Sequence, residues 1–210
     1  MGCKKMKKGV FITFEGAEGS GKSTQIRNAA SFFRHQKRQV VLLREPGGTR
    51  ISEAIRSVLL DRGNRGMSHV TELLLYLSAR AQIVHEKILP ALRSGKVVIC
   101  DRFEDSTLAY QGYGRGIPLP LIREVSRLVR GTLRPDLTFV LDIDIKKGLS
   151  RGGRHDRIER EAFSFHQKVR RGFLALARKE PRRVIVVDSG QPLPEVSRRV
   201  LEKLQNVFGE

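Results

Sequence analysis

Short apolar runs alternate along the chain with segments in which apolar residues recur every three or four positions. Runs rich in β-branched residues predict buried strands at residues 10–14, 40–43, 97–100, 137–141 and 184–187. Helical spacing predicts helices at residues 23–36, 51–60, 70–93 and 119–129, and a last one lined by Val196, Val200, Leu204 and Val207. Buried strands separated by helices are typical of a parallel sheet covered on both faces. The pattern predicts a three-layer α/β protein with a five-stranded parallel sheet.

Glycine-rich segments interrupt this pattern and predict loops. Pro46-Gly47-Gly48 follows the second strand, and glycines at 112, 114 and 116 punctuate the segment after the third strand. No repeat, low-complexity tract or linker rich in Pro and Gly divides the chain. We therefore expect residues 9–210 to form a single domain, preceded by a disordered basic extension at residues 1–8, MGCKKMKK.

Length and composition exclude several classes of protein. Forty per cent of the 210 residues are apolar, which is enough for a core and excludes wholesale disorder. No apolar run approaches the roughly 18–20 residues that span a bilayer, so we expect no membrane partner. The two cysteines, Cys3 and Cys100, cannot form a disulfide framework, which favours a reducing, cytoplasmic location.

The charge of the chain is strongly positive. It has 40 Lys and Arg against 22 Asp and Glu, a net charge of +18. Residues 151–183 alone carry 11 basic and 4 acidic side chains, a net of +7. Such a surface attracts polyanions, including nucleic acids and phosphorylated ligands. A solvated face with no dedicated partner is the simpler explanation of the excess.

Residues 16–23, Gly-Ala-Glu-Gly-Ser-Gly-Lys-Ser, match the phosphate-loop pattern G-x-x-x-x-G-K-[ST] at every fixed position. The loop follows a predicted strand and opens a predicted helix, so that its N–H groups and the helix dipole converge on a phosphate. The Lys22 ammonium would bridge the β- and γ-phosphates, and the Ser23 hydroxyl would ligate Mg²⁺. We expect the nucleotide to contact Gly16, Ala17, Glu18, Gly19, Ser20, Gly21, Lys22, Ser23 and Thr24. The fold expected is therefore that of a P-loop NTPase.

The phosphate loop occurs in GTPases, motors, transporters and kinases, so it does not identify the reaction. A GTPase would carry an N-K-x-D motif, which this sequence lacks. Helicases and motors are normally longer. The small size and the Arg-rich segment late in the chain favour a small-molecule kinase.

The third predicted strand ends in Asp101 and Arg102. An acid at the carboxyl end of a parallel strand points into the ligand crevice beside the first strand. There Asp101 could complete the Mg²⁺ shell, and the guanidinium fork of Arg102 could hold an acceptor phosphate. Taken alone, the two residues could equally be an ordinary surface pair.

The segment that begins at Asp101 resembles the D-R-[FYH]-x-x-S-x-x-A-[YF] signature of thymidylate kinases. The resemblance extends from about residue 9 to residue 208. The other matching segments are Phe14-Glu15-Gly16, Arg44-Glu45-Pro46-Gly47-Gly48-Thr49, Leu77-Ser78-Ala79-Arg80, Tyr110-Gln111-Gly112 and Asp156-Arg157-Ile158-Glu159. The resemblance implies Mg²⁺-dependent transfer of the γ-phosphate of ATP to thymidylate (dTMP), giving dTDP for dTTP synthesis.

The resemblance also implies roles for individual residues. Arg102 matches the arginine that holds the dTMP phosphate, and Tyr76 matches the aromatic that stacks on thymine, although its spacing also suits plain helix core. Arg80 matches the arginine that hydrogen-bonds the base. The remaining substrate-binding residues are Glu45, Pro46, Ser106, Thr107, Tyr110 and Gln111. Among them, Tyr110 matches the ring that crowds the sugar 2′ position and so favours deoxyribose.

Glu18 matches the loop acid that approaches the substrate 3′-hydroxyl. Some thymidylate kinases place a catalytic arginine in this loop, whereas this chain offers only Glu18 there. Residues 148–158 resemble the family's lid, and Arg151 and Arg154 within it would supply the missing cation. The chain thus resembles the bacterial type with lid arginines. The catalytic residues implied are Lys22, Arg102, Arg151, Arg154 and Glu18.

The family resemblance further implies a homodimer, for which the helix around residues 73–88 is a candidate face. Two other functions remain as alternatives. One is another nucleoside monophosphate kinase or a deoxynucleoside kinase. The other is a nucleotide-dependent nucleic-acid-binding protein, suggested by the charge but not by any RNA-binding signature or interleaved aromatics. We expect no specific nucleic-acid partner.

Overall fold

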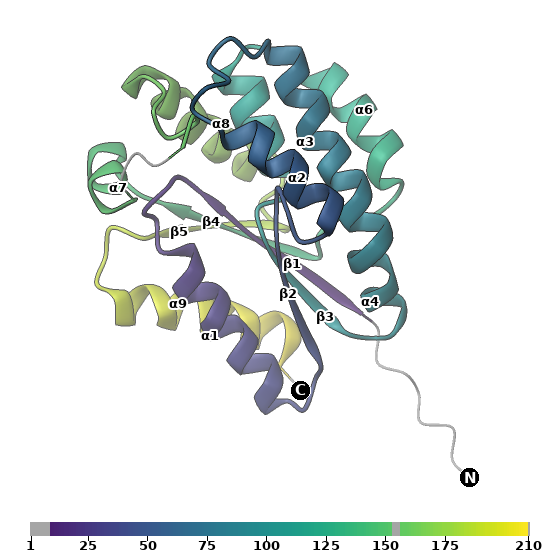
Figure 1. Cartoon of the computed structure of the whole chain (residues 1–210). Helices are drawn as coiled ribbons and strands as arrows, with labels where there is room; N and C mark the ends of the chain where they lie inside the picture. Colours follow the sequence, from purple (N-terminus) through teal and green to yellow (C-terminus); the bar gives the residue numbers. More distant parts are fainter. Residues whose placement is uncertain (1–8, 153–155, 210) are drawn as a thin grey trace.

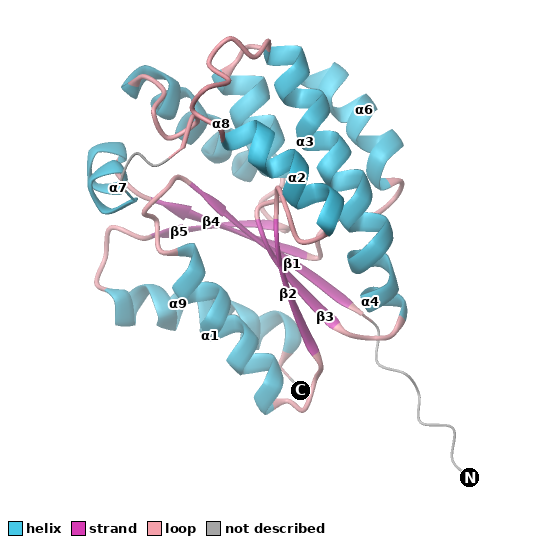
Figure 2. Cartoon of the chain, viewed as in Figure 1, coloured by secondary structure: helices cyan, strands magenta, loops and turns pink. Residues whose placement is uncertain are grey.

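Five parallel strands form the centre of the molecule in the order β2-β3-β1-β4-β5 (Figures 1 and 2). The structure is a computed structural model that describes residues 9–152 and 156–209. Its strands are β1 (Val10–Gly16), β2 (Val40–Arg44), β3 (Val97–Asp101), β4 (Leu137–Asp142) and β5 (Val184–Asp188). The predicted five-stranded sheet and the three-layer α/β architecture are confirmed.

Helices cover both faces of the sheet because the strand side chains alternate between two apolar clusters. Ile12, Phe14 and Phe139 pack against α1 (Lys22–His35) and α9 (Leu193–Phe208), which lie together below the sheet in Figure 1. Phe11 and Val98 face the opposite layer. That layer contains α2 (Arg50–Leu60), α3 (His69–Ile83), α4 (Leu89–Arg93), α6 (Leu119–Arg130) and α8 (Phe163–Lys179).

The helix predicted from 70 to 93 is interrupted by a π-helical turn. It consists of α3, η1 (Val84–Ile88) and α4, and Pro90 lies in the first turn of α4. A proline has no N–H to donate, and its ring crowds the carbonyl four residues earlier. The wider η1 turn relieves that crowding and allows the chain to continue in a helical direction.

Three further helical segments lie where the hydrophobic pattern predicted a loop or no element. The loop expected around glycines 112 and 114 is helical instead, formed by α5 (Glu104–Thr107) and η2 (Leu108–Gly114). In the Arg-rich segment the structure adds α7 (Ile145–Gly152) and α8. The buried side of α8 has helical spacing, with Phe165, Val169, Phe173 and Leu176. Basic residues between these positions obscure that spacing in the sequence.

Two of the sequence-based expectations lie outside the described residues: the extension at residues 1–8 and the lid residue Arg154. Within the described ranges, no helix is both long and apolar enough to cross a membrane.

Candidate active site

Three segments of the sequence meet at the carboxyl end of the sheet. β1 lies between β3 and β4, with Phe14 opposite Asp101 and Gly16 opposite Leu141. The Arg102 N–H donates to the Phe14 carbonyl at 2.9 Å, and the Glu45 N–H donates to the Asp101 carbonyl at 2.9 Å. The phosphate loop, the segment that begins at Arg44 and the segment that begins at Asp101 therefore form one site.

The phosphate loop wraps around the ammonium group of Lys22. Lys22 Nζ donates to the carbonyl oxygens of Gly16 (3.2 Å) and Ala17 (3.0 Å), and its side chain is buried. Gly21 caps α1 with φ 85°, a left-handed conformation that glycine adopts without strain. Burial lowers the pKa of Lys22, and the nearby Arg102 charge adds to this effect. A buried cation held by neutral carbonyls is well prepared to receive an anionic ligand.

The helix α7 packs directly on the phosphate loop. A methyl group on Gly19 would lie 2.1 Å from the Gly148 carbonyl oxygen and 3.0 Å from Arg151 Cβ. Gly19 and Gly148 thus allow two backbones to approach closely, which side chains at either position would prevent. This packing places Arg151, an exposed residue, beside the loop that would hold the phosphates.

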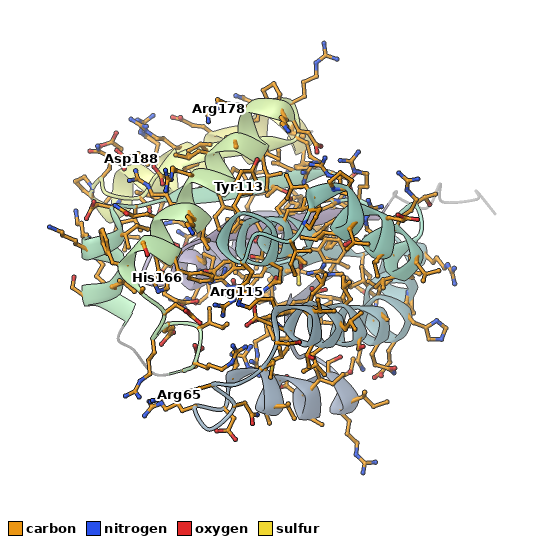
Figure 3. The ribbon with its side chains drawn as sticks, turned by 90° about the horizontal axis from the view of Figure 1, so that it is seen from above. Arg65, Tyr113, Arg115, His166, Arg178 and Asp188 are labelled. Atoms are coloured by element: carbon orange, nitrogen blue, oxygen red, sulfur yellow. The ribbon has the colours of Figure 1, made fainter. Side chains whose placement is uncertain are left out.

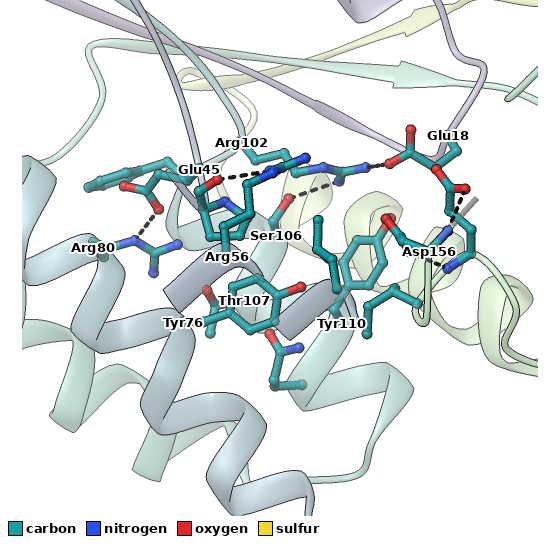
Figure 4. Close-up of a pocket in the computed structure, with 16 residues that line it drawn as sticks. Glu18, Glu45, Arg56, Tyr76, Arg80, Arg102, Ser106, Thr107, Tyr110 and Asp156 are labelled. Atoms are coloured by element: carbon teal, nitrogen blue, oxygen red, sulfur yellow. Dashed lines mark hydrogen bonds and ion pairs between the residues drawn. The ribbon is translucent and has the colours of Figure 1, made fainter. Parts of the chain in front are cut away.

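A cavity opens next to the loop (Figure 4). The acceptor-side residues expected from the sequence all line it: Glu18, Glu45, Pro46, Tyr76, Arg80, Arg102, Ser106, Thr107, Tyr110 and Gln111. The structure adds Arg56, Leu60, Phe103, Asp156, Ile158 and Glu159. The cavity is therefore built by α2, α3, α5, η2, residues 156–159 and the loops that follow β1, β2 and β3.

Arg102 crosses one end of the cavity. Its Nη2 donates to Glu18 Oε1 at 2.5 Å and its Nη1 donates to Ser106 Oγ at 3.2 Å. Its guanidinium carbon lies 5.1 Å from the centre of the Tyr110 ring. Burial alone would raise the pKa of Glu18, but the charges of Arg102 and Lys22 lower it to about 2. Glu18 is therefore a carboxylate that neutralises Arg102 until another anion takes its place.

Glu45 and Arg80 form a buried ion pair at the other end. Arg80 Nε donates to Glu45 Oε2 at 2.7 Å, and Arg80 lies over the Phe103 ring at 4.8 Å. Within the described residues, Glu45 Oε1 and Arg80 Nη1 are buried and make no hydrogen bond. Buried polar atoms normally have partners, so this end presents a donor and an acceptor to a polar ligand.

Arg56 is a cavity residue that the sequence analysis did not identify. It lies on α2, and its Nη1 donates to the Pro46 carbonyl at 2.8 Å. It provides a second guanidinium group near the end of the cavity that Arg102 crosses. The sequence offered only a weak signal, because an arginine on a half-buried helix face is usually a solvated residue.

Glu15 is a second residue that the sequence analysis did not assign to the site. The side chain is fully buried, and its two oxygens accept hydrogen bonds from the Phe103 N–H (2.7 Å) and the Ser106 hydroxyl (2.5 Å). These bonds hold the turn in which Arg102 adopts φ 71°, a left-handed conformation unfavourable for a residue other than glycine. Glu15 thus fixes the backbone from which Arg102 reaches the cavity.

Stability should fall with pH because of Glu15. Burial, with a contribution from Asp105, raises the pKa of Glu15 from 4.5 to about 8. The folded state then holds a proton that the unfolded state loses, so Glu15 costs stability progressively as pH rises from 4.5 to about 8. In Glu15→Gln the amide oxygen can accept from the Phe103 N–H and the amide NH₂ can donate to the Ser106 hydroxyl, so both contacts persist without a titrating group. We expect the melting temperature of the variant to rise relative to that of the wild type as the pH increases across this range. A difference in melting temperature that does not change with pH would contradict the raised pKa of Glu15.

Two oxygen donors fit a magnesium ion. Asp101 Oδ1 is buried without a hydrogen bond from any described residue, and the Asp101 charge acts on Lys22 of the loop. The Ser23 side chain is exposed in the first turn of α1. The described part of the chain contains no group of three His, Cys, Asp or Glu side chains suited to a metal. Mg²⁺ does not require one, since it keeps several waters and binds few protein ligands.

Comparisons with known proteins agree with this arrangement. A model of the thymidylate kinase family matches residues 14–200. The thymidylate kinase of Symbiobacterium thermophilum is 50% identical over 201 residues, covering 95% of this chain and 94% of that protein. The thymidylate kinase of Geobacter sulfurreducens is 49% identical, covering 94% and 97%. The crystal structure of thymidylate kinase from Ehrlichia chaffeensis superimposes with a TM-score of 0.77 at 37% identity, covering 94% and 99%.

Proposed function

This chain belongs to the thymidylate kinase family, and we propose that the cavity and phosphate loop described above perform the reaction of that family. The enzyme phosphorylates dTMP to dTDP, a step in dTTP synthesis. ATP is the phosphate donor, and Mg²⁺ accompanies it. The observation that supports this most directly is a single cavity with Arg102 at one end and the unsatisfied Glu45–Arg80 pair at the other.

The two ends of the cavity suit the two ends of dTMP. The phosphate would take the place of the Glu18 carboxylate on Arg102, and the released Glu18 would approach the 3′-hydroxyl. The base would lie along Tyr76, with Arg80 donating to a thymine carbonyl and Thr107 and Gln111 nearby. The Tyr110 ring, which burial keeps neutral by raising its pKa to about 12, would exclude a 2′-hydroxyl.

ATP would lie along the phosphate loop, from Gly16 to Thr24. The Lys22 ammonium would exchange its bonds to loop carbonyls for the β- and γ-phosphates. Ser23 and Asp101 would hold Mg²⁺, which neutralises phosphate charge when it is bound. Transfer requires little covalent chemistry from the protein, so catalysis here is positioning and charge stabilisation.

The lid completes the donor site. Arg151 already lies beside Gly19, and Arg154 follows in the part of the lid outside the described residues. Since the loop carries Glu18 where some thymidylate kinases have an arginine, these two residues would supply the guanidinium that the loop lacks. We accordingly propose that the enzyme is of the bacterial type with lid arginines.

We also propose that the enzyme is a cytoplasmic homodimer. Large apolar side chains are exposed on α3, at Val70 and Leu74, and on α6, at Leu121 and Leu128. Leu128 is 86% exposed, and several exposed apolar side chains on two helices that pack on each other favour a partner there. Sedimentation velocity of wild type and Leu128→Glu tests this proposal, because the charge should dissociate a dimer built on this face.

The reaction is tested by coupled ATP turnover against a panel of acceptors. We expect turnover with dTMP and little with thymidine, because Arg102 needs an acceptor phosphate. Turnover with deoxyuridylate and other monophosphates measures the selectivity for the base. Turnover with single-stranded DNA tests the alternative of a nucleic-acid-dependent enzyme. Turnover stimulated only by DNA would contradict the proposal.

Arg102→Lys should fail as a conservative replacement. Lysine offers a point charge in place of a planar fork, so it cannot hold the phosphate in the place of Glu18 while it also donates to Ser106. We expect kcat/KM for dTMP to fall about a hundredfold or more, mostly through KM. Steady-state kinetics with ATP held saturating measures this, and Tyr110→Phe, which keeps the ring, serves as the mild control. An Arg102→Lys variant with near-normal KM would remove Arg102 from the phosphate site.

A further inference from the structure

Glu72 is a fully buried carboxylate behind the wall of the cavity. It lies on α3, one turn before Tyr76, and has no exposed surface. Its Oε1 accepts hydrogen bonds from Gln111 Nε2 and Arg115 Nε, both at 3.0 Å. Its Oε2 accepts from Arg115 Nη2 at 3.0 Å and lies 2.7 Å from Arg157 Nη2. Only 9% of the Arg115 side chain is exposed, and in the view from above Arg115 lies near the centre of the molecule, whereas Arg65 lies toward its lower edge (Figure 3).

These partners keep Glu72 ionised. Burial alone would raise the pKa of Glu72, but the hydrogen bonds from Arg115 and Gln111 lower it below its ordinary value. An ionised carboxylate accepts hydrogen bonds and has none to donate. The Gln111 amide must therefore turn its NH₂ group toward Glu72, which directs its carbonyl oxygen away from Glu72.

Gln111 lines the cavity, so the direction of its amide decides what the cavity presents to a base. Thymine carries an N–H at ring position 3 beside a carbonyl at position 4. Cytosine has an unprotonated nitrogen and an amino group at those positions. A Gln111 carbonyl oxygen that faces position 3 can accept a hydrogen bond from the thymine N–H. It has no hydrogen to donate to the unprotonated nitrogen of cytosine.

We propose that Glu72 is a positioning residue that sets base specificity: it holds the Gln111 amide so that an acceptor faces the pyrimidine. The inference rests on the proposed function, since it assumes that dTMP occupies this cavity. Arg80 lines the same cavity, and its guanidinium can donate to the carbonyl at position 4, which thymine has and cytosine lacks. Glu72 thereby acts on selectivity without touching the substrate.

The test compares kcat/KM for dTMP and for dCMP in the full-length enzyme. In Glu72→Gln the Gln111 amide can turn either way, so we expect the preference for dTMP over dCMP to fall about ten- to a hundredfold. The exchange variant Glu72→Gln/Gln111→Glu should regain selectivity, because a carboxylate at 111 again offers only acceptors.

Arg157→Met is the matched control. Arg157 also donates to the Leu59 carbonyl of α2 at 3.0 Å and lies near the end of the lid segment 148–158. Its loss therefore disturbs the attachment of the lid to α2 but leaves the Glu72 carboxylate for Gln111. We expect turnover of both substrates to fall together with an unchanged preference. If Glu72 had a purely structural role, Glu72→Gln would likewise lower the turnover of dTMP and dCMP together and leave the preference between them unchanged.

A measurement on the wild type covers the case in which Glu72→Gln does not fold. A crystal structure with dTMP at about 1.2 Å or better shows the amide hydrogens. We expect both Gln111 amide hydrogens to point away from N3 of the base. Amide hydrogens facing N3, an unchanged preference in Glu72→Gln, or an unselective exchange variant would overturn the proposal. A wild type that does not phosphorylate dTMP would instead contradict the proposed function.

Discussion

Replacing Lys22 with alanine is expected to lower kcat by about a thousandfold or more. The ammonium group is buried in the loop and held by two carbonyl oxygens, so it reaches the phosphates without a large rearrangement. Because transfer depends on stabilising charge on the phosphoryl oxygens, no neighbouring group replaces it. Coupled turnover at saturating ATP and dTMP measures the loss.

The lysine variant needs a control for folding and for charge. Lys87 is exposed on η1 and pairs only weakly with its neighbour Glu86 at 3.4 Å, so Lys87→Ala removes the same charge away from the cavity. We expect Lys87→Ala to keep wild-type turnover and both variants to keep a cooperative thermal transition. A folded Lys22→Ala enzyme with near-normal kcat would exclude the phosphate-loop mechanism.

Loss of both lid arginines is expected to have an effect of similar size. Charge spreads over three oxygens of the transferred phosphoryl group, and a positioned arginine there is typically worth about 10³–10⁵ in rate. Arg151 is held near the loop by the close packing of Gly148 on Glu18 and Gly19. We expect Arg151→Ala/Arg154→Ala to lower kcat by that factor with little change in the KM for dTMP, the pattern of an interaction made in the transition state.

The single variants Arg151→Ala and Arg154→Ala show which arginine contributes more. We favour Arg154 because it is nearer in sequence to the matching segment Asp156-Arg157-Ile158-Glu159. Arg178→Ala is the matched control, since Arg178 is exposed in the last turn of α8, at the periphery of the molecule (Figure 3). A double variant that keeps most of its kcat would place the catalytic cation elsewhere.

The sequence predicted those parts of the site that are contiguous in the chain. The phosphate loop was predicted because its glycines, Lys22 and Ser23 occupy eight consecutive positions between a strand and a helix. The acceptor segment was predicted for the same reason, because Asp101 and the residues after it carry a continuous signature. The central strands were predicted because a strand buried on both faces is apolar along its whole length. The edge strands β2 and β5 are equally apolar, but the prediction that 40–43 is buried was wrong, since β2 has a neighbouring strand on one side only.

The helix α8 was missed for a physical reason. Its apolar positions face the sheet and η2, while its other faces carry five of the basic residues that dominate the local composition: Lys168, Arg170, Arg171, Arg178 and Lys179. Charge excess indicates solvent on one side of a helix but does not show what the other side covers. The interruption at η1 was equally hidden, because helical spacing of apolar residues continues across it.

What only the tertiary structure decided is how distant residues act on one another. Glu18 and Arg102, 84 positions apart, form an ion pair, and Glu15 holds the turn of Phe103 across 88 positions. Arg56 and Glu72 lie on helices without any local motif, so their roles follow from the side chains that folding brings to them. The sequence by itself determined the sheet, the phosphate loop and the acceptor segment, since each depends on neighbours in the chain. The charge state, direction and partners of the side chains depend on neighbours in space, which the order β2-β3-β1-β4-β5 and the helices above it bring together.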